Sequence, residues 1–232
     1  MKKNICWGLF ILSMALYIDN FYFRLLLPLT SIVSANIALF LMIFLVHSFF
    51  YPKNTTDHAQ VISYPPMIML FSINLSVSFF ILGFYIDIDF IERIILFNTG
   101  FLDLINSTVF SLLGIHILYR SSGLFFMFLS IVIISLAVKQ FTNIEEDPNP
   151  ATSSKSIIAV GIYNWTRNPM YLGLVIFQFG LGCALLHAEI ITLSLLTLII
   201  FNYFVVKREE EYLERKFGDT YLIYKKKVRR WL

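Results

Sequence analysis

Two polar motifs interrupt an otherwise apolar chain. The first is RNPMYLG at residues 167–173, and the second is the carboxylate run Glu209–Glu211. A guanidinium such as that of Arg167 can hold an anionic group with two parallel hydrogen bonds. Carboxylates brought close to it can bind a cation or a group rich in hydroxyls. The two motifs could therefore hold one ligand that carries both kinds of group.

The same residues also have a purely structural interpretation. Glu211 and Arg215 lie one helical turn apart, so the acidic run can be a solvated helix start with intrahelical ion pairs. Arg167 can likewise meet the carboxylates instead of a ligand. The residue types alone leave both interpretations open.

The composition indicates the class of protein that must position these motifs. Of 232 residues, 58% are hydrophobic, 17% are aromatic and only 14% are charged, which excludes an ordinary soluble globular protein. A helix that crosses a membrane needs about 20 apolar residues, and isolated strands cannot satisfy their backbone in lipid. We therefore predict an all-α fold, a polytopic membrane helical bundle of 6–7 transmembrane helices.

Seven apolar stretches follow one another, near residues 5–27, 30–51, 65–86, 94–119, 122–139, 169–187 and 189–206. The first contains Asp19 and Arg24, so a bundle of six spans with a non-spanning first segment stays open. Most Lys and Arg residues fall on the side that holds the 139–167 connector and the C-terminal tail. The positive-inside rule then makes that side cytoplasmic.

The tail, residues 207–232, is predicted to be a cytoplasmic amphipathic helical segment. Apolar residues recur there at spacings of three and four, at Leu213, Phe217, Tyr221, Tyr224, Val228 and Trp231. Gly218 as a C-cap and Asp219 as an N-cap predict a break between two short helices. The basic residues near the end would attract anionic lipid, with Trp231 at the depth of the headgroups.

The strings GIYNWTRNPMYLG and REEEYLERKFGDTYLIYKKKVRRWL, separated by a two-helix hairpin, resemble the C-terminal signature of the isoprenylcysteine carboxyl methyltransferase and phospholipid methyltransferase superfamily. In that pattern an Arg-His-Pro-x-Tyr-x-Gly type motif precedes the hairpin, and Glu-Glu-x-x-Leu-x-x-x-Phe-Gly-x-x-Tyr-x-x-Tyr follows it. The second part matches in register at Glu209, Glu210, Leu213, Phe217, Gly218, Tyr221 and Tyr224. The resemblance is specific over residues 161–232, weaker over 94–160 and absent from the first 90 residues.

The resemblance implies an integral membrane methyltransferase that uses S-adenosylmethionine and acts on a lipophilic acceptor, similar to protein-S-isoprenylcysteine O-methyltransferase. It implies catalytic roles for Arg167, which would hold a carboxylate, and for Glu210, which would hold an ammonium group or ribose hydroxyls. Gly173 would let the backbone and the ligand approach closely. The residues that it implies for cofactor binding are Tyr163, Arg167, Asn168, Pro169, Met170, Tyr171, Gly173, Glu209, Glu210 and Tyr224.

The resemblance also divides the chain. Residues 1–93 would be N-terminal transmembrane helices of unknown role, and residues 94–232 a methyltransferase-like membrane domain. Its cofactor site would be formed by the 139–173 segment and the 207–232 tail. The implied partners are a lipophilic small molecule or a lipidated substrate together with membrane lipids, with no nucleic acid, and the oligomeric state stays open. The implied location is the inner membrane of a bacterium.

One departure from the family pattern keeps other functions open. Asn168 stands where the family commonly has a histidine, and an amide hydrogen-bonds but does not titrate near neutral pH. The alternatives are a phospholipid N-methyltransferase, an NADPH enzyme of the sterol reductase architecture, and a non-catalytic lipid-binding membrane scaffold. The four histidines show no ligand spacing, so no metal site is expected.

Overall fold

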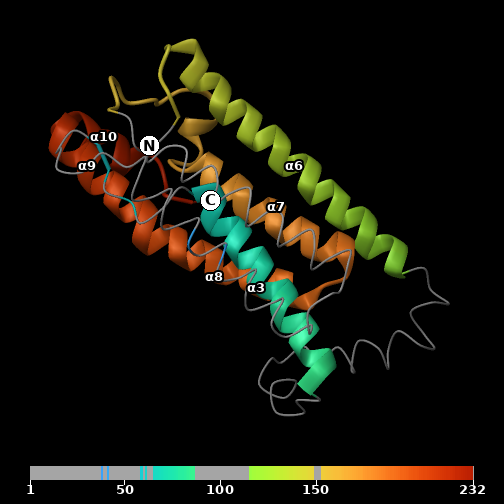
Figure 1. Cartoon of the computed structure of the whole chain (residues 1–232). Coiled ribbons are helices and arrows are strands. Elements are labelled where there is room, and N and C mark those ends of the chain that lie inside the picture. The colour runs from blue at the N-terminus through green and yellow to red at the C-terminus, as the bar shows by residue number, and fades with distance from the viewer. Residues whose placement is uncertain are drawn as a thin grey trace, which may run out of the picture.

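The computed structural model describes residues 38, 41, 58–59, 61, 65–86, 115–148 and 153–231. All regular structure within these residues is helical, which confirms the all-α prediction for this part of the chain. The predicted spans at 5–27 and 30–51, and most of the one at 94–119, lie outside the described residues. The described elements are α3 (Pro65–Ile86), α6 (Ile115–Asn143), the 3₁₀ helix η2 (Gly161–Asn164), α7 (Pro169–Leu185), α8 (Ala188–Ile200), the π-helix η3 (Phe201–Val206), α9 (Lys207–Phe217) and α10 (Asp219–Lys227) (Figure 1).

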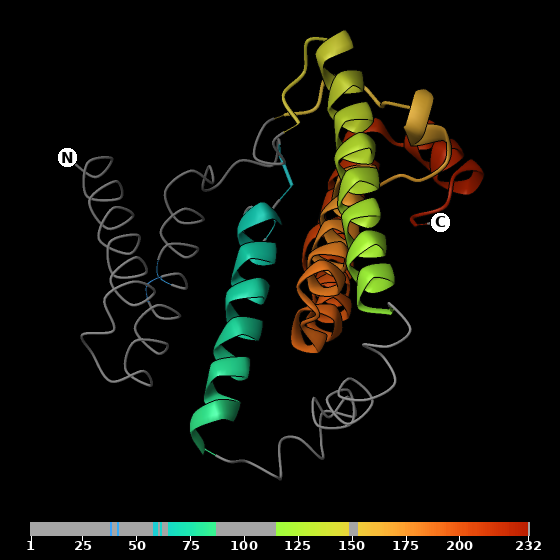
Figure 2. The ribbon, with the colours of Figure 1, turned by 90° about the vertical axis from the view of Figure 1, so that its right-hand side faces the viewer.

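Glycines set the distance between α6 and α7, which run side by side in both views of the ribbon (Figures 1 and 2). A Cβ atom on Gly123 would lie 2.3 Å from the backbone nitrogen of Ala184, and one on Gly180 would lie 2.8 Å from the Gly123 carbonyl oxygen. The Ser130 hydroxyl donates a hydrogen bond of 2.8 Å across this interface to the Gly173 carbonyl. Small residues at such a crossing allow close backbone approach, which favours helix association in lipid.

The predicted hairpin is present at α7 and α8. Leu186 ends α7 in the left-handed conformation, with φ 61° and ψ 35°, and α8 returns after His187. This second arm continues through η3 into α9 without a break, so one helix carries both the apolar span and the acidic motif. The predicted break between two tail helices is confirmed at Gly218, where φ is 52°, but Asp219 is the first residue of α10 and not its N-cap.

A buried polar network fastens α3 to this hairpin. The Gln178 amide donates to the Ser72 hydroxyl at 3.0 Å, and the Thr197 hydroxyl donates to the Gln178 carbonyl oxygen at 2.9 Å. The three side chains are buried, so each polar atom must find its partner within the protein. Hydrogen bonds of this kind between helices act as specific contacts where all the surroundings are apolar.

Within the part of the chain that the structure describes, two helices, Ile117–Asn143 and Ala188–Phe217, are long and apolar enough to cross a membrane. The predicted boundary near residue 120 is absent, because α6 runs through Arg120 and Ser121 without interruption. Large apolar side chains on both helices are exposed, including Leu124, Phe128 and Leu195. The apolar part of the second helix ends at Val206, since eight of the next eleven residues, the whole of α9, are charged.

The polar segments gather at one end of the bundle. The connector after α6, the short helix η2, α9 and α10 all lie there (Figure 2). Ala59 and Val61, just before α3, are buried and pack in the same core as Tyr171 and Phe201. These residues just before α3 thus contribute to the core on which this polar end rests.

Replacing Gly180 with valine tests the α6–α7 crossing. The new side chain must push against the α6 backbone, so we expect a loss of roughly 1–3 kcal/mol in the free energy of unfolding. Thermal unfolding in detergent, followed by circular dichroism, measures it. The control Leu124→Val changes an exposed side chain on α6 and should leave the midpoint close to that of the wild type. Equal midpoints for all three proteins would show that the crossing is not tightly packed.

Candidate functional site

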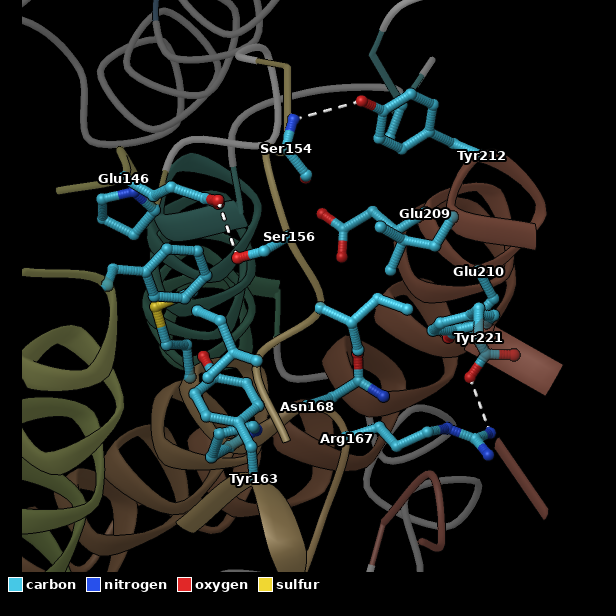
Figure 3. Close-up of a pocket in the computed structure, with 18 of the residues that line it drawn as sticks. Glu146, Ser154, Ser156, Tyr163, Arg167, Asn168, Glu209, Glu210, Tyr212 and Tyr221 are labelled. Atoms are coloured by element: carbon cyan, nitrogen blue, oxygen red, sulfur yellow. Dashed lines mark hydrogen bonds and ion pairs between the residues drawn. The ribbon is translucent and has the colours of Figure 1, made fainter. Parts of the chain in front are cut away.

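A cavity of about 120 Å³ opens at the polar end of the bundle, between the start of α7, the helices α9 and α10, and the connector after α6 (Figure 3). All but one of the residues predicted to bind a cofactor line it: Tyr163, Arg167, Asn168, Pro169, Met170, Tyr171, Glu209, Glu210 and Tyr224. The fold therefore brings both sequence motifs to one place.

Gly173 is the predicted residue that does not line the cavity. A Cβ atom on it would lie 2.5 Å from Cγ1 of Ile134 on α6. The close approach that this glycine allows is therefore one between two helices.

The local geometry of the RNPMYLG motif starts a helix at the cavity. Pro169 occupies the first turn of α7, where its missing N–H costs nothing. Asn168 precedes it with extended φ (−130°), and its side chain makes no capping hydrogen bond. Its amide donates instead to the Arg230 carbonyl at 3.1 Å, and the Thr166 hydroxyl donates to the same oxygen at 2.9 Å. The entrance of the hairpin is thus bound to the end of the tail.

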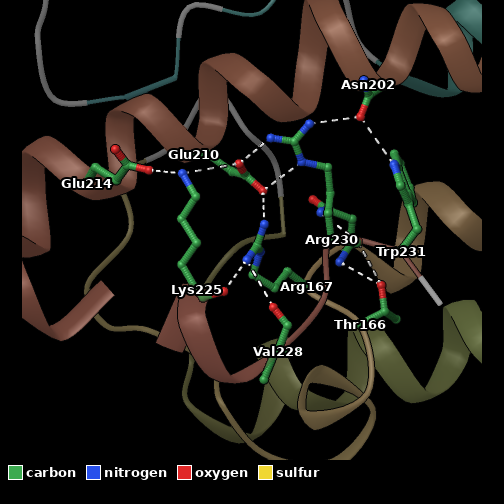
Figure 4. Close-up of polar contacts among 10 residues, drawn as sticks. Thr166, Arg167, Asn202, Glu210, Glu214, Lys225, Val228, Arg230 and Trp231 are labelled. Carbon is green, nitrogen blue, oxygen red and sulfur yellow. Dashed lines mark hydrogen bonds and ion pairs between the residues drawn. The ribbon is translucent and has the colours of Figure 1, made fainter. Parts of the chain in front are cut away.

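Glu210 forms the centre of a buried ion cluster (Figure 4). One carboxylate oxygen accepts from Nη2 of Arg167 at 2.8 Å and from Nε of Arg230 at 3.1 Å, and the other accepts from Nη2 of Arg230 at 2.6 Å. Nζ of Lys225 lies 3.8 Å from the second oxygen. Glu210 is only 4% exposed. Burial alone would raise its pKa, but the hydrogen bonds and charges of Arg230 and Arg167 hold it below its ordinary value.

Arg167 uses most of its N–H groups in hydrogen bonds within the protein. Nη1 donates to the carbonyls of Lys225 at 2.7 Å and Val228 at 2.9 Å, and the backbone N–H donates to the Arg229 carbonyl at 2.9 Å. Its Nε is buried and has no hydrogen-bond partner within the described part of the chain. Arg167 therefore holds the start of α7 against the tail.

Arg230 and Asn202 complete this cluster, and sequence analysis did not single out either as a site residue. Nη1 of Arg230 and Nε1 of Trp231 both donate to the Asn202 side-chain oxygen, at 2.9 and 3.2 Å. Trp231 is half-buried against the core. The available signal was Asn202 itself, because a polar residue inside an apolar run indicates a specific partner.

Glu209 has different partners from Glu210, although both carboxylates lie beyond the apolar part of their helix. It accepts a hydrogen bond from the Tyr171 hydroxyl, and no cationic side chain pairs with it among the described residues. Burial is the main cause that raises its pKa to about 7, with Tyr171 opposing and Glu210 adding to the rise. The cavity thus contains a carboxylate whose charge is not neutralised by the protein.

The opposite wall comes from the connector and from aromatic side chains. Oε1 of Glu146 accepts hydrogen bonds from the Lys155 amide at 2.9 Å and the Ser156 hydroxyl at 3.1 Å, and the Ser154 amide donates to the Tyr212 hydroxyl at 3.1 Å. These contacts hold the connector over the cavity. Their residues carry no motif that would have marked them in the sequence.

Tyr163 and Phe141 give this wall an aromatic surface, with ring centroids 6.0 Å apart in an edge-to-face arrangement. The Tyr224 hydroxyl donates to the Tyr163 carbonyl at 2.7 Å. Burial raises the pKa of Tyr163, and it raises the pKa of Tyr224 to about 12. Both phenols therefore stay protonated at neutral pH.

Breaking the cluster at Glu210 should release the tail. In Glu210→Ala, Arg167 loses its counter-ion while still buried, which typically costs about 3–5 kcal/mol. Limited trypsin digestion should then cut at the basic residues 225–230 much faster than in the wild type. The matched control is Glu211→Ala, an exposed neighbour with no ion pair in the described structure. Equal digestion rates in the two variants would contradict a tail held by this cluster.

Comparison with known proteins adds an independent observation. The sequence model of the phospholipid methyltransferase family matches residues 122–220, a range that includes Arg167, Glu209 and Glu210. An uncharacterised protein of Haemophilus influenzae is 43% identical over 67 residues, which are 27% of this chain and 100% of that protein. No solved structure matches.

Characterised relatives come from eukaryotes. Protein-S-isoprenylcysteine O-methyltransferase of Saccharomyces cerevisiae is 32% identical over 78 residues, 33% of this chain and 32% of the relative. The enzyme of the same name from Xenopus laevis is 35% identical over 82 residues, 34% of this chain and 28% of the relative. The chain matches about a third of the length of these enzymes. The matched region, which contains both motifs at the cavity, belongs to the isoprenylcysteine carboxyl methyltransferase and phospholipid methyltransferase superfamily.

Proposed function

We propose that this chain is an S-adenosylmethionine-dependent membrane methyltransferase that acts on a lipophilic acceptor. The observation that carries the proposal is the cavity at which RNPMYLG meets the acidic motif, with Glu209 on its wall and no cationic partner for it in the described structure. The similarity to protein-S-isoprenylcysteine O-methyltransferases supports the same class of reaction.

The groups around the cavity fit this cofactor. The Glu209 carboxylate suits an ammonium group, a sulfonium or ribose hydroxyls, and the unpartnered Nε of Arg167 suits one oxygen of a carboxylate. The Tyr163 and Phe141 rings offer an apolar surface for a purine. When bound, the cofactor supplies a methyl group on a positively charged sulfur.

We assign Arg167 a contact with the cofactor and Glu210 a positioning role. Both oxygens of Glu210 already accept hydrogen bonds from guanidinium groups, so this carboxylate acts through Arg167 and the tail. Asn168 acts in the same way through the Arg230 carbonyl. Contact with the cofactor is then left to Glu209, Tyr171, Tyr163 and Tyr224, with Pro169 and Met170 shaping the wall.

Methyl transfer from sulfur is an in-line displacement, so the protein must align donor and acceptor and exclude water. The connector, held by Glu146 and Tyr212, covers the cavity on one side. A carboxylate acceptor needs no base. An amine acceptor would have to lose a proton, and the Glu209 carboxylate on the wall could accept it.

The wider setting is part of the same proposal. We infer that the cavity and the tail face the cytoplasm, that the chain spans the inner membrane of a bacterium several times, and that the acceptor enters from the lipid. The methyltransferase-like part covers residues 94–232, with residues 1–93 as additional membrane helices. The positive-inside distribution of Lys and Arg supports this orientation.

Titration calorimetry on the detergent-purified chain tests the cofactor. We expect S-adenosylmethionine and S-adenosylhomocysteine to bind. Glu209→Gln should lower the affinity for S-adenosylmethionine by at least tenfold, which is the order expected for losing one charged hydrogen bond. Glu211→Gln removes the same charge from an exposed neighbour and should bind like the wild type. NADPH serves as the control for a reductase. If folded wild-type protein binds neither the donor nor its product, the proposal fails.

The pH dependence of this affinity tests Glu209 more directly. Its pKa of about 7 means that the carboxyl is mostly neutral at pH 5.5 and mostly ionised at pH 7.5. A cationic ligand binds the ionised form, so affinity should rise with pH in this window, by roughly 20-fold. Glu209→Gln stays neutral and should show a flat profile. A wild-type profile as flat as that of the variant would show that Glu209 does not contact the cation.

A further inference from the structure

The last helix, α10, has two sharply different faces. Its inner face comprises Tyr221, Tyr224 and Lys225, and Val228 follows on the same side directly after the helix; all four are buried or half-buried. On the opposite face, Leu222 and Ile223 are exposed, Ile223 to 68%, beside the exposed Lys226 and Lys227. Exposed branched apolar residues next to lysines make this outer face amphipathic.

The orientation of this outer face is fixed by the inner one. Arg167 donates to two carbonyls at the end of α10, Tyr224 donates to the Tyr163 carbonyl, and Lys225 pairs with Glu214. α10 therefore cannot roll over to bury Leu222 and Ile223 without losing these contacts.

Asn202 shows at which depth of the bundle the tail is held. This residue binds Arg230 and Trp231, and it lies in η3 at the end of the apolar run. Its neighbours Tyr203 and Phe204 are exposed aromatic side chains, and the charged helix α9 starts at Lys207. Aromatic side chains followed by charges mark the boundary between hydrocarbon and headgroups. The segment that carries α10 is therefore held at headgroup depth.

Charge and aromatic content point to the partner. Lys226, Lys227 and Arg229 are exposed and have no ion pair within the described part of the chain. Trp165 is 78% exposed and outside the cavity, two residues before Arg167, whose amide binds the Arg229 carbonyl. Leucine, isoleucine and tryptophan beside unpaired cations match the requirements of a helix that lies on an anionic lipid surface.

We propose that the outer face of α10, defined by Leu222, Ile223, Lys226 and Lys227, docks together with Trp165 and Arg229 on the anionic lipid leaflet next to the cavity. The inner face of the same helix contributes Tyr221 and Tyr224 to the cavity wall. α10 is then a partition with lipid headgroups on one side and the site on the other. This surface does not depend on methyl transfer.

Fluorescence quenching by lipid tests the proposal on the full chain. The protein is reconstituted into vesicles of brominated phosphatidylcholine, alone or mixed with brominated phosphatidylglycerol. The contribution of Trp165 is the difference between the wild type and Trp165→Phe. We expect it to be quenched more strongly when phosphatidylglycerol is present, and the increase to fade at high salt.

Two double variants locate the lipid contact. Lys226→Gln with Lys227→Gln should lose the increase caused by phosphatidylglycerol, while its thermal midpoint in detergent stays at the wild-type value. Lys139→Gln with Lys155→Gln removes the same charge from exposed positions on α6 and the connector, and it should keep the increase. Equal quenching of Trp165 in both lipids, or an increase retained by the α10 variant, would overturn the proposal.

Discussion

The polar end of this protein depends on the compensation of one buried charge, that of Glu210. A carboxylate removed from water is tolerated only when cations and hydrogen bonds replace its hydration, and here two guanidinium groups supply both. Arg167 comes from the entrance of the hairpin, Glu210 from its exit and Arg230 from the tail. Their pairing fixes three segments relative to one another, and the cavity is the space that remains where they meet.

The adjacent carboxylates of Glu209 and Glu210 lie in opposite electrostatic environments. Glu210 is surrounded by cations and stays ionised, whereas Glu209 has a phenol as its partner, and its burial brings its pKa to about 7. Separation of this kind lets neighbouring acids perform different tasks. Asn168 needs no titratable side chain for its role, because its amide donates a hydrogen bond to the Arg230 carbonyl.

The sequence predicted the features that repeat or that sit in motifs, and it missed those that depend on partners. The apolar hairpin, the break at Gly218 and the meeting of Arg167 with the acidic run follow from periodicity, spacing and the shared side of a hairpin. That Arg167 would bind Glu210 and not only a ligand was left open, because a pair of opposite charges does not reveal whether it is satisfied internally. Arg230 looked like one more lipid-facing cation, and only the folded tail shows that it turns inward while Lys226 and Lys227 do not.

The π-helix η3 has a further consequence for how the membrane part and the chemical part of the chain are coupled. In a continuous helix each residue advances the face by about 100°, and a π-turn accommodates one residue more than an α-turn. η3 therefore sets the rotational phase between the apolar arm and α9. If this turn closed as an ordinary α-turn, Glu209 would take the place where Glu210 now meets its arginines. The wider turn thus rotates α9 relative to the apolar arm. The arm can face lipid while Glu210 on α9 stays in contact with the tail.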